Sequence, residues 1–180
     1  MVYVILADGF EEIEAIEPVD IMRRAGIDVK TVSIMPSRTV TGAHGIKVEA
    51  DIMVSDCDPN AMELLMLPGG GGHTLLDASN EVHALMNFAH VNGRYLAAIC
   101  AAPSIPGKKQ ILTGKKATCY PGFEKYCYGA EMTGAKAVSD GKIITGRGPG
   151  AAADFGFELV RLLKGSKTAD ELREVMQYND

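Results

Sequence analysis

The hydrophobic positions of this chain fall into short continuous runs separated by longer segments with helical spacing. The first run, VYVILA (2–7), is apolar and rich in β-branched residues, and it is closed by Asp8-Gly9. Such a run is typical of a strand buried on both faces, which indicates a parallel sheet. Further strands are predicted at DVKTVSI (28–34), ELLMLPGGGGH (63–73, breaking into glycines at its end), RYLAAI (94–99), KKATCY (115–120), KAVS (136–139) and KIITG (142–146).

Helical spacing is clearest in EEIEAIEPVDIMRRAG (11–26), which has acids at its start and arginines at its end, as the helix dipole favours. Gly26 is a natural C-terminal cap. Pro18 cannot donate to the Glu14 carbonyl, so a kink or an unpaired acceptor is expected there. Further helices are predicted at 80–91 after a Ser79 cap, at 149–165, and from Thr168, where Thr168-Ala169-Asp170-Glu171 has capping-box spacing.

The alternation of strands with helices predicts an α/β fold with a doubly wound, mostly parallel sheet sandwiched by helices. The segment TVTGAHGIKVEAD (39–51) alternates around two glycines and predicts a short hairpin or an excursion at the sheet edge. In open sheets of this kind, ligands bind beyond the carboxyl ends of the strands. The chain has three such places: the loop from Asp8 to Glu14, the glycine loop from Gly69 to His73, and Cys100.

Length and charge exclude several classes of protein. The chain has 180 residues, 47% of them hydrophobic, which predicts one domain over 1–180. Its formal net charge of -5 gives no general attraction to nucleic acid or anionic lipid. The N-terminus lacks a basic region and a long apolar run, so neither a signal peptide nor a membrane span is expected.

Four cysteines, at positions 57, 100, 119 and 127, form no C-x-x-C pair and have no histidines nearby at metal-binding spacing. We therefore expect neither a zinc site nor a disulfide framework. Reduced thiols in a cytoplasmic location are the expectation.

Cys100 lies where a strand meets a predicted helix starting near Ala101. The first N–H groups of a helix lack internal partners and carry partial positive charge, so they favour a thiolate and stabilise an oxyanion. A tight turn from strand to helix also exposes the residue at its apex, as in a nucleophile elbow. The alternative is a buried structural cysteine among alanines, and the local sequence leaves both open.

The glycine loop lacks the spacing of a nucleotide-binding loop. In a functional interpretation, the loop brings backbone without side chains close to a substrate bound at the thiol, and the Gly70 N–H donates to an oxyanion. The alternative is a flexible turn without a role in the site.

The four glutamates of segment 11–17 are mostly expected to be solvated helix acids. One of them could point toward Cys100 and exchange a proton with it, but composition does not choose among the four.

Five motifs occur in order over nearly the whole chain: LADGFEEIEAIEPVDIMRRAGI, LMLPGG, LAAICAAPSI, GKKATCYPGFE and TGRGPGAAADF. Together they resemble the ThiJ/PfpI superfamily, in the branch that contains the parkinsonism-associated protein deglycase. The resemblance implies a flavodoxin-like sandwich, a homodimer and an activity that needs no cofactor. Five ordered motifs are far more specific than any one of them alone.

The resemblance also implies roles for particular residues. Cys100 would be the reactive cysteine on a strained elbow, and Glu14 would be the glutamate hydrogen-bonded to its sulfur. The backbone amides of Gly70 and Ala101 would form the oxyanion pocket. Arg147 would lie close to the site near the dimer interface.

The chain departs from the pattern of the relatives in three places. Tyr120 occupies a place where many relatives have histidine, so a cysteine–histidine pair made that way is missing and protease chemistry is not expected. His44 occupies the place of a second arginine of the dimer site in some relatives, which implies a weaker and pH-sensitive anion pocket. Pro106 and Gly107 follow the elbow closely and predict a short or broken helix.

Two functional hypotheses follow. The first is a cysteine-dependent glyoxalase or deglycase that acts on small 2-oxoaldehydes or their adducts, of the type that converts methylglyoxal to lactate. The second is a redox-sensing or stress-protective, chaperone-like protein that acts through oxidation of Cys100. A third interpretation, a flavodoxin-like domain without catalysis, predicts a buried Cys100 with an ordinary pKa.

Overall fold

The computed structural model describes residues 1–178, and its centre is a seven-stranded sheet in the order β10-β11-β7-β6-β1-β2-β5. Neighbouring strands are parallel except β10 and β11, which are antiparallel. This confirms the predicted α/β, doubly wound sheet. The strands are β1 (Val2–Leu6), β2 (Val29–Ser33), β5 (Ile52–Met53), β6 (Leu64–Leu67), β7 (Tyr95–Ile99), β10 (Ala137–Asp140) and β11 (Ile143–Gly146).

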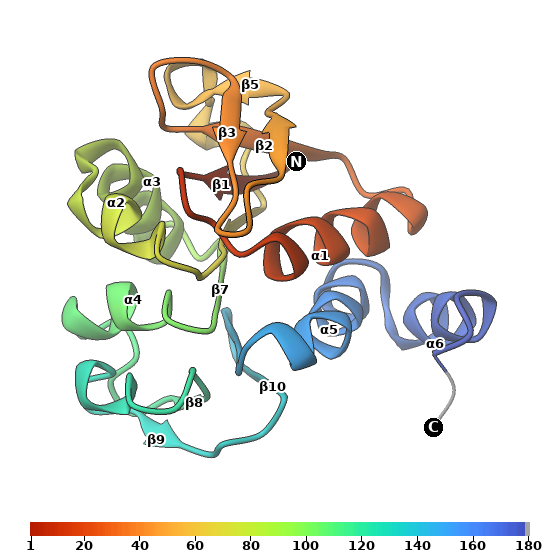
Figure 1. Ribbon diagram of the computed structural model, residues 1–180. Helices are drawn as coiled ribbons and strands as arrows, with labels where there is room; N and C mark the ends of the chain where they lie inside the picture. Colours follow the sequence, from red (N-terminus) through yellow and green to blue (C-terminus); the bar gives the residue numbers. More distant parts are fainter. Residues whose placement is uncertain (179–180) are drawn as a thin grey trace.

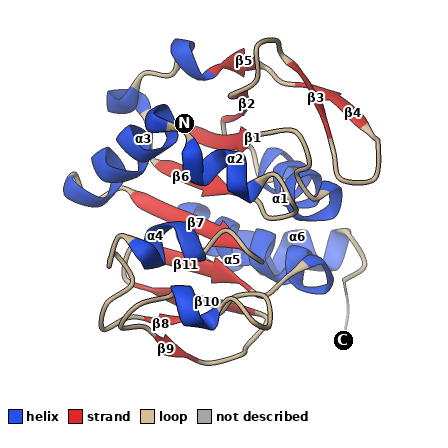
Figure 2. Cartoon of the chain, turned by 60° about the vertical axis from the view of Figure 1, so that its left-hand side comes forward, coloured by secondary structure: helices blue, strands red, loops and turns tan. Residues whose placement is uncertain are grey.

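Helices cover both faces of the sheet, as Figure 1 and Figure 2 show. One face carries α1 (Glu12–Arg24), α5 (Ala152–Lys164) and α6 (Ser166–Val175). The other face carries α2 (His73–Ala78), α3 (Asn80–Val91) and α4 (Ser104–Lys108). Within residues 1–178, no helix has both the length and the apolar character needed to cross a membrane.

The alternation of side chains along β1 divides the core into two parts. Val4 and Leu6 lie in the buried cluster beneath α1 and α5, whereas Tyr3 and Ile5 lie in the cluster beneath α3. Both faces of β1 are therefore buried, as its continuous apolar run predicted.

Two small sheets lie outside the central one. The strands β3 (Thr39–Thr41) and β4 (Lys47–Glu49) form an antiparallel hairpin, which confirms the prediction for this segment. The predicted strand KKATCY shortens to β8 (Lys116–Ala117), which pairs with β9 (Glu131–Met132) instead of joining the central sheet. Side chains of β10 and β11 hold the backbone of this segment. The Lys116 N–H donates to the Asp140 carboxylate, and the Thr118 N–H donates to the Thr145 hydroxyl.

Helix α1 ends as the sequence predicted. Gly26 has a φ of 69°. The N–H groups of Gly26 and Ile27 donate to the carbonyls of Arg23 (3.0 Å) and Met22 (3.1 Å), which is the geometry of a Schellman cap. The helix runs without interruption through Pro18, which has no N–H to complete its helical hydrogen bond.

The predicted start of the last helix at Thr168 is wrong, because α6 begins at Ser166. Gly165 has a φ of 90°, which lets the chain turn directly from α5 into α6. The Thr168 hydroxyl therefore lies inside the helix, where it donates to the Lys164 carbonyl (3.2 Å) instead of capping the N-terminus.

The helix expected near Ala101 also begins later than predicted. Residues 101–103 form a turn, and α4 starts at Ser104 and has five residues. Four short 3-10 helices complete the described elements: Val54–Asp56, Pro59–Ala61, Glu124–Tyr126 and Pro149–Ala151. The shortness of α4 confirms what the proline and glycine after the elbow predicted.

Candidate active site

Cys100 follows β7 directly and has a φ of 65°, in the left-handed region that residues with a side chain rarely adopt. Backbone hydrogen bonds hold the elbow on both sides. The Cys100 N–H donates to the Gly146 carbonyl (2.9 Å), and the Tyr120 N–H donates to the Cys100 carbonyl (2.8 Å). The chain therefore has a strained elbow at the position that the sequence indicated.

Glu14 and Cys100 meet at the α-carbon of Gly69. A Cβ on Gly69 would lie 2.5 Å from Glu14 Oε2 and 2.6 Å from the Cβ of Cys100. Glu14 Oε2 accepts the Gly69 N–H (3.0 Å), and the same Cβ on Gly69 would lie 3.1 Å from the Cys100 sulfur, so the carboxyl group and the thiol flank one point. Glu14 is fully buried, so the structure identifies which of the four glutamates faces the thiol.

Gly69 is a residue of the site that the sequence analysis did not single out. Its role depends on glycine having no side chain, because any Cβ at this position would separate the Glu14 carboxyl group from the Cys100 sulfur. The only signal in the sequence was its place at the start of the glycine run, and that signal does not distinguish Gly69 from Gly70 or Gly71.

Glu11 and Glu12 are buried and not solvated, which corrects the expectation for this segment. Glu11 is the N-cap of α1, and its side chain accepts the Glu14 N–H (2.8 Å). This bond positions the first turn of α1, from which Glu14 reaches the thiol.

The backbone N–H groups of Gly70 and Ala101 face the Cys100 thiol and favour its thiolate form, because both lower its pKa. Gly70 has a φ of 78°, and a Cβ on it would lie 2.5 Å from both the Gly9 carbonyl oxygen and the Glu11 nitrogen. The glycine loop therefore packs backbone to backbone against the loop after β1. This contact fixes the direction of the Gly70 N–H, so the loop is not a free turn.

Burial raises the pKa of Glu14 to about 7, although its hydrogen bonds to Cys100 and Gly69 oppose the shift. Burial and the Glu14 carboxylate raise the pKa of the Cys100 thiol to about 12, against the two N–H donors. The pair therefore loses one proton near neutral pH and keeps the second. The two groups share the retained proton. It lies either on Cys100, beside a Glu14 carboxylate, or on Glu14, beside a Cys100 thiolate.

Of the two interpretations of Cys100 that the sequence left open, an exposed thiolate of low pKa is not the one found in the structure. Cys100 is 8% exposed and its pKa is raised. Burial outweighs the two N–H donors, and α4 begins too late and is too short to add a strong helix dipole. The thiol becomes a thiolate only by giving its proton to Glu14.

Tyr120 and Arg147 lie beside the elbow. Together with Lys136 and Gly148 they line a cavity of about 350 Å³. A Cβ on Gly148 would be 3.2 Å from the Tyr120 ring. Both Tyr120 and Arg147 are exposed, so this cavity is open to solvent next to the site.

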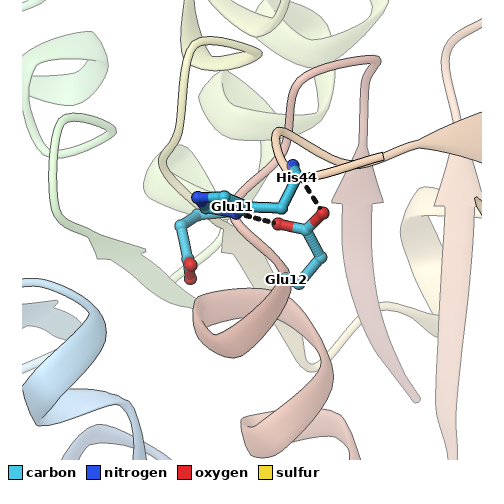
Figure 3. Close-up of side chains that lie close together, drawn as sticks. All are labelled: Glu11, Glu12 and His44. Carbon is cyan, nitrogen blue, oxygen red and sulfur yellow. Dashed lines mark hydrogen bonds and ion pairs between the residues drawn. The ribbon is translucent and has the colours of Figure 1, made fainter. Parts of the chain in front are cut away.

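His44 binds the N-terminal turn of α1, not the thiol. Its N–H and its Nδ1 lie 2.8 Å from the two carboxylate oxygens of Glu12, as Figure 3 shows. Burial opposes the ionisation of Glu12, but the hydrogen bonds of His44 hold its pKa below the usual value. The hydrogen bond to Glu12 raises the pKa of His44. The pair fastens the β3–β4 hairpin to α1.

Glu11, Glu12 and His44 have ligand atoms within 4.8 Å of one another, the spacing of a metal site. Each side chain is already engaged, because Glu11 caps α1 and both Glu12 oxygens accept bonds from His44. We therefore assign a structural role to this group.

The buried Glu14 carboxyl makes the stability of the protein depend on pH. In the folded state Glu14 stays protonated up to about pH 7, whereas in the unfolded chain it has the usual pKa of 4.5. The free energy of unfolding therefore falls as the pH rises between these values. Compared with Glu14→Gln, the wild type should lose about 3 kcal/mol more of its free energy of unfolding over this pH range. Urea unfolding at pH 5 and pH 8 measures the difference. Exposed Glu171→Gln is the control that should follow the wild type, and equal pH dependence in Glu14→Gln would contradict the assignment.

Known proteins resemble this chain in both sequence and fold. Protein DJ-1 homolog B of Arabidopsis thaliana is 40% identical over 93% of this chain, and deglycase TK1284 of Thermococcus kodakarensis is 30% identical over 91% of this chain and 99% of its own length. The chain spans 39% and 45% of the length of the two Arabidopsis relatives.

The structure of oxidized DJ-1 from Toxoplasma gondii superimposes with a TM-score of 0.95 at 29% identity, covering 99% of this chain and 98% of that one. The sheet and its flanking helices therefore form the flavodoxin-like α/β fold of these proteins. A model of the DJ-1/PfpI family matches residues 1–162, and with this match over most of its length the chain belongs to the DJ-1/PfpI family.

Proposed function

We propose that this protein is a cofactor-independent glyoxalase or deglycase that acts on small 2-oxoaldehydes or their adducts through Cys100. The observation that carries the proposal is the contact of Cys100 and Glu14 across Gly69, with two N–H groups directed at the sulfur. A family member named as a deglycase supports it. The site combines a nucleophile, a proton acceptor and an oxyanion pocket.

The reaction begins when the Cys100 sulfur attacks the aldehyde carbon, while its proton passes through Glu14 to the carbonyl oxygen to give a hemithioacetal. The N–H groups of Gly70 and Ala101 stabilise the oxygen as it gains charge. The Glu14 carboxylate then takes the proton from C1 and returns it to C2, while the hydroxyl proton on C1 passes to the oxygen on C2, which yields a thioester of a 2-hydroxy acid. Water cleaves the thioester, releases the hydroxy acid and restores the thiol.

Glu14 suits this transfer because its pKa is raised to about 7 by burial. A group that both accepts and returns a proton is most effective when its pKa lies near the working pH. Peptide hydrolysis is not proposed: Tyr120 stands where many relatives have histidine, and within residues 1–178 no hydrogen bond joins a histidine to the Cys100 sulfur.

The second candidate is a redox sensor that responds through oxidation of Cys100. The N–H groups of Gly70 and Ala101, which favour the thiolate, would bind the oxygens of a sulfinate, and Glu14 in its protonated form would donate to one of them. A solved relative is described as oxidized. The two candidates differ in turnover, because the enzyme converts a 2-oxoaldehyde to a hydroxy acid and the sensor does not.

The shared proton predicts how alkylation of Cys100 depends on pH. The rate in the wild type should rise with an inflection near pH 7 and then level off, because the pair loses its one labile proton there. In Glu14→Gln the inflection should move to alkaline pH. Iodoacetamide modification located by peptide mass spectrometry measures both profiles, with Cys100→Ser as the background. An inflection that Glu14→Gln does not move would contradict proton sharing.

Turnover is tested by methylglyoxal consumption with detection of lactate. Cys100→Ser should form no lactate, and Glu14→Gln should lose about 100-fold or more of the rate, the usual loss on removing a general acid–base. Cys57→Ser, which changes a thiol outside the site, should keep the wild-type rate. A wild type without turnover whose Cys100 is selectively oxidised by peroxide would favour the sensor instead.

We also propose that the protein forms a homodimer through the exposed face of α1. Ile13 and Ile16 on α1 and Ile46 beside β4 are 51%, 37% and 57% exposed. They line one groove of about 920 Å³. An apolar patch of this kind, together with the dimer that the family resemblance implies, supports a second copy of the chain as its occupant.

Ile13→Lys should convert the dimer to a monomer, because it places a charge at the centre of the apolar patch. Sedimentation velocity measures the outcome over a range of concentrations. The control is Val91→Lys on α3, a residue 80% exposed on the opposite face of the sheet. A wild type that is monomeric, or a dimer that survives Ile13→Lys, would contradict this interface.

A further inference from the structure

His73 ends the glycine loop and is the first residue of α2. Its Nδ1 atom lies 2.7 Å from the Gly70 carbonyl oxygen. A carbonyl oxygen only accepts hydrogen bonds, so Nδ1 carries a proton and donates it to this bond. The backbone N–H of His73 donates to the same oxygen (3.2 Å). His73 therefore holds the Gly70 carbonyl through two donors, one from its ring and one from its backbone.

The ring of His73 is held in this orientation from a second side. It packs edge to face on Phe123, with 5.4 Å between the ring centroids and an angle of 84° between the ring planes. Phe123 lies in the loop after β8, where its N–H donates to the Tyr120 carbonyl (3.1 Å). The Tyr120 N–H in turn donates to the Cys100 carbonyl (2.8 Å). His73 therefore joins the glycine loop to a second loop that is bonded to the elbow.

Two peptide units meet at the α-carbon of Gly70, and each is held by a different contact. The unit before Gly70 is held by Glu11, whose N–H donates to the Gly69 carbonyl (3.2 Å). Because a trans peptide unit is planar, its N–H points away from Glu11. This unit borders the thiol, since a Cβ on Gly69 would lie 3.1 Å from the Cys100 sulfur. The unit after Gly70 is held by His73.

Gly70 itself does little to fix the angle between these two units. It has a φ of 78° and no side chain, and glycine moves between conformations more readily than any other residue. An oxyanion donor is most effective when it is held in place before the charge develops, because no reorganisation is then needed during the reaction. The bond from the ring to the Gly70 carbonyl supplies this restraint on the side that Glu11 does not reach.

We propose that His73 is a positioning residue of the oxyanion pocket, whose Nδ1–H bond to the Gly70 carbonyl keeps the Gly70 N–H directed at the oxygen that gains charge. The inference rests on the proposed function and adds a residue to it. Within residues 1–178, no hydrogen bond joins His73 to the Cys100 sulfur, so His73 acts through Gly70.

Two substitutions at position 73 test the bond. His73→Leu keeps a branched side chain that can pack on Phe123 but has no donor. His73→Asn restores a donor, because its amide nitrogen is separated from the backbone by as many bonds as Nδ1. With methylglyoxal as substrate, His73→Leu should lower kcat about 10-fold or more and change KM little, since an oxyanion donor acts on the transition state. His73→Asn should recover most of the loss.

Thr74→Val is the matched control. The Thr74 hydroxyl donates to the Gly71 carbonyl (2.9 Å), a bond of the same span in the same loop. The peptide unit of that carbonyl does not include Gly70, so Thr74→Val should keep the wild-type kcat. Circular dichroism shows whether each variant is folded, and His73→Ala, which also lacks the donor, replaces His73→Leu if leucine disturbs the loop.

Alkylation of Cys100 by iodoacetamide gives a second measurement that needs no turnover. The Gly70 N–H favours the thiolate, so the plateau rate should fall severalfold in His73→Leu and recover in His73→Asn. If the wild type forms no lactate, the proposed function fails, and this comparison alone decides whether His73 positions the Gly70 N–H. A wild-type kcat or plateau rate in His73→Leu would overturn the proposal. So would a loss that His73→Asn does not recover, or an equal loss in Thr74→Val.

Discussion

The burial of one carboxyl group beneath the glycine loop is the interaction on which the rest of the site depends. Glu14 is fully enclosed, yet only one of its oxygens accepts a hydrogen bond, from the Gly69 N–H, and Oε1 has no partner among the described residues. A carboxyl in this position is costly to ionise. That cost brings its pKa to about 7, where it can exchange a proton with a thiol that burial keeps protonated.

The fold supplies this enclosure by bringing three backbone segments together. Strands β1, β6 and β7 are neighbours in the sheet, so the loops at their carboxyl ends meet at one edge. Their contact is possible because glycines leave room: a Cβ on Gly72 would lie 2.8 Å from the Asp8 carbonyl oxygen, and one on Gly69 would fill the space between Glu14 and Cys100. The glycine run is therefore a packing requirement of the site.

Much of this arrangement could be predicted from the sequence, because the apolar runs fix the strands and parallel strands place their ends at one edge. The choice of Glu14 could not, since it depends on the direction in which α1 leaves its Glu11 cap. The direction of the pKa shift of Cys100 also depends on burial that no local pattern reports.

The partner of the Cys100 thiol decides which chemistry the site can support. Burial disfavours a second negative charge in the pair, so Cys100 and Glu14 share one proton near neutral pH. Because this partner is a carboxyl, the proton can move to it and return, and the pair is unchanged at the end of a cycle. The identity of the partner, and not the pKa of the cysteine alone, suits the site to the proposed reaction.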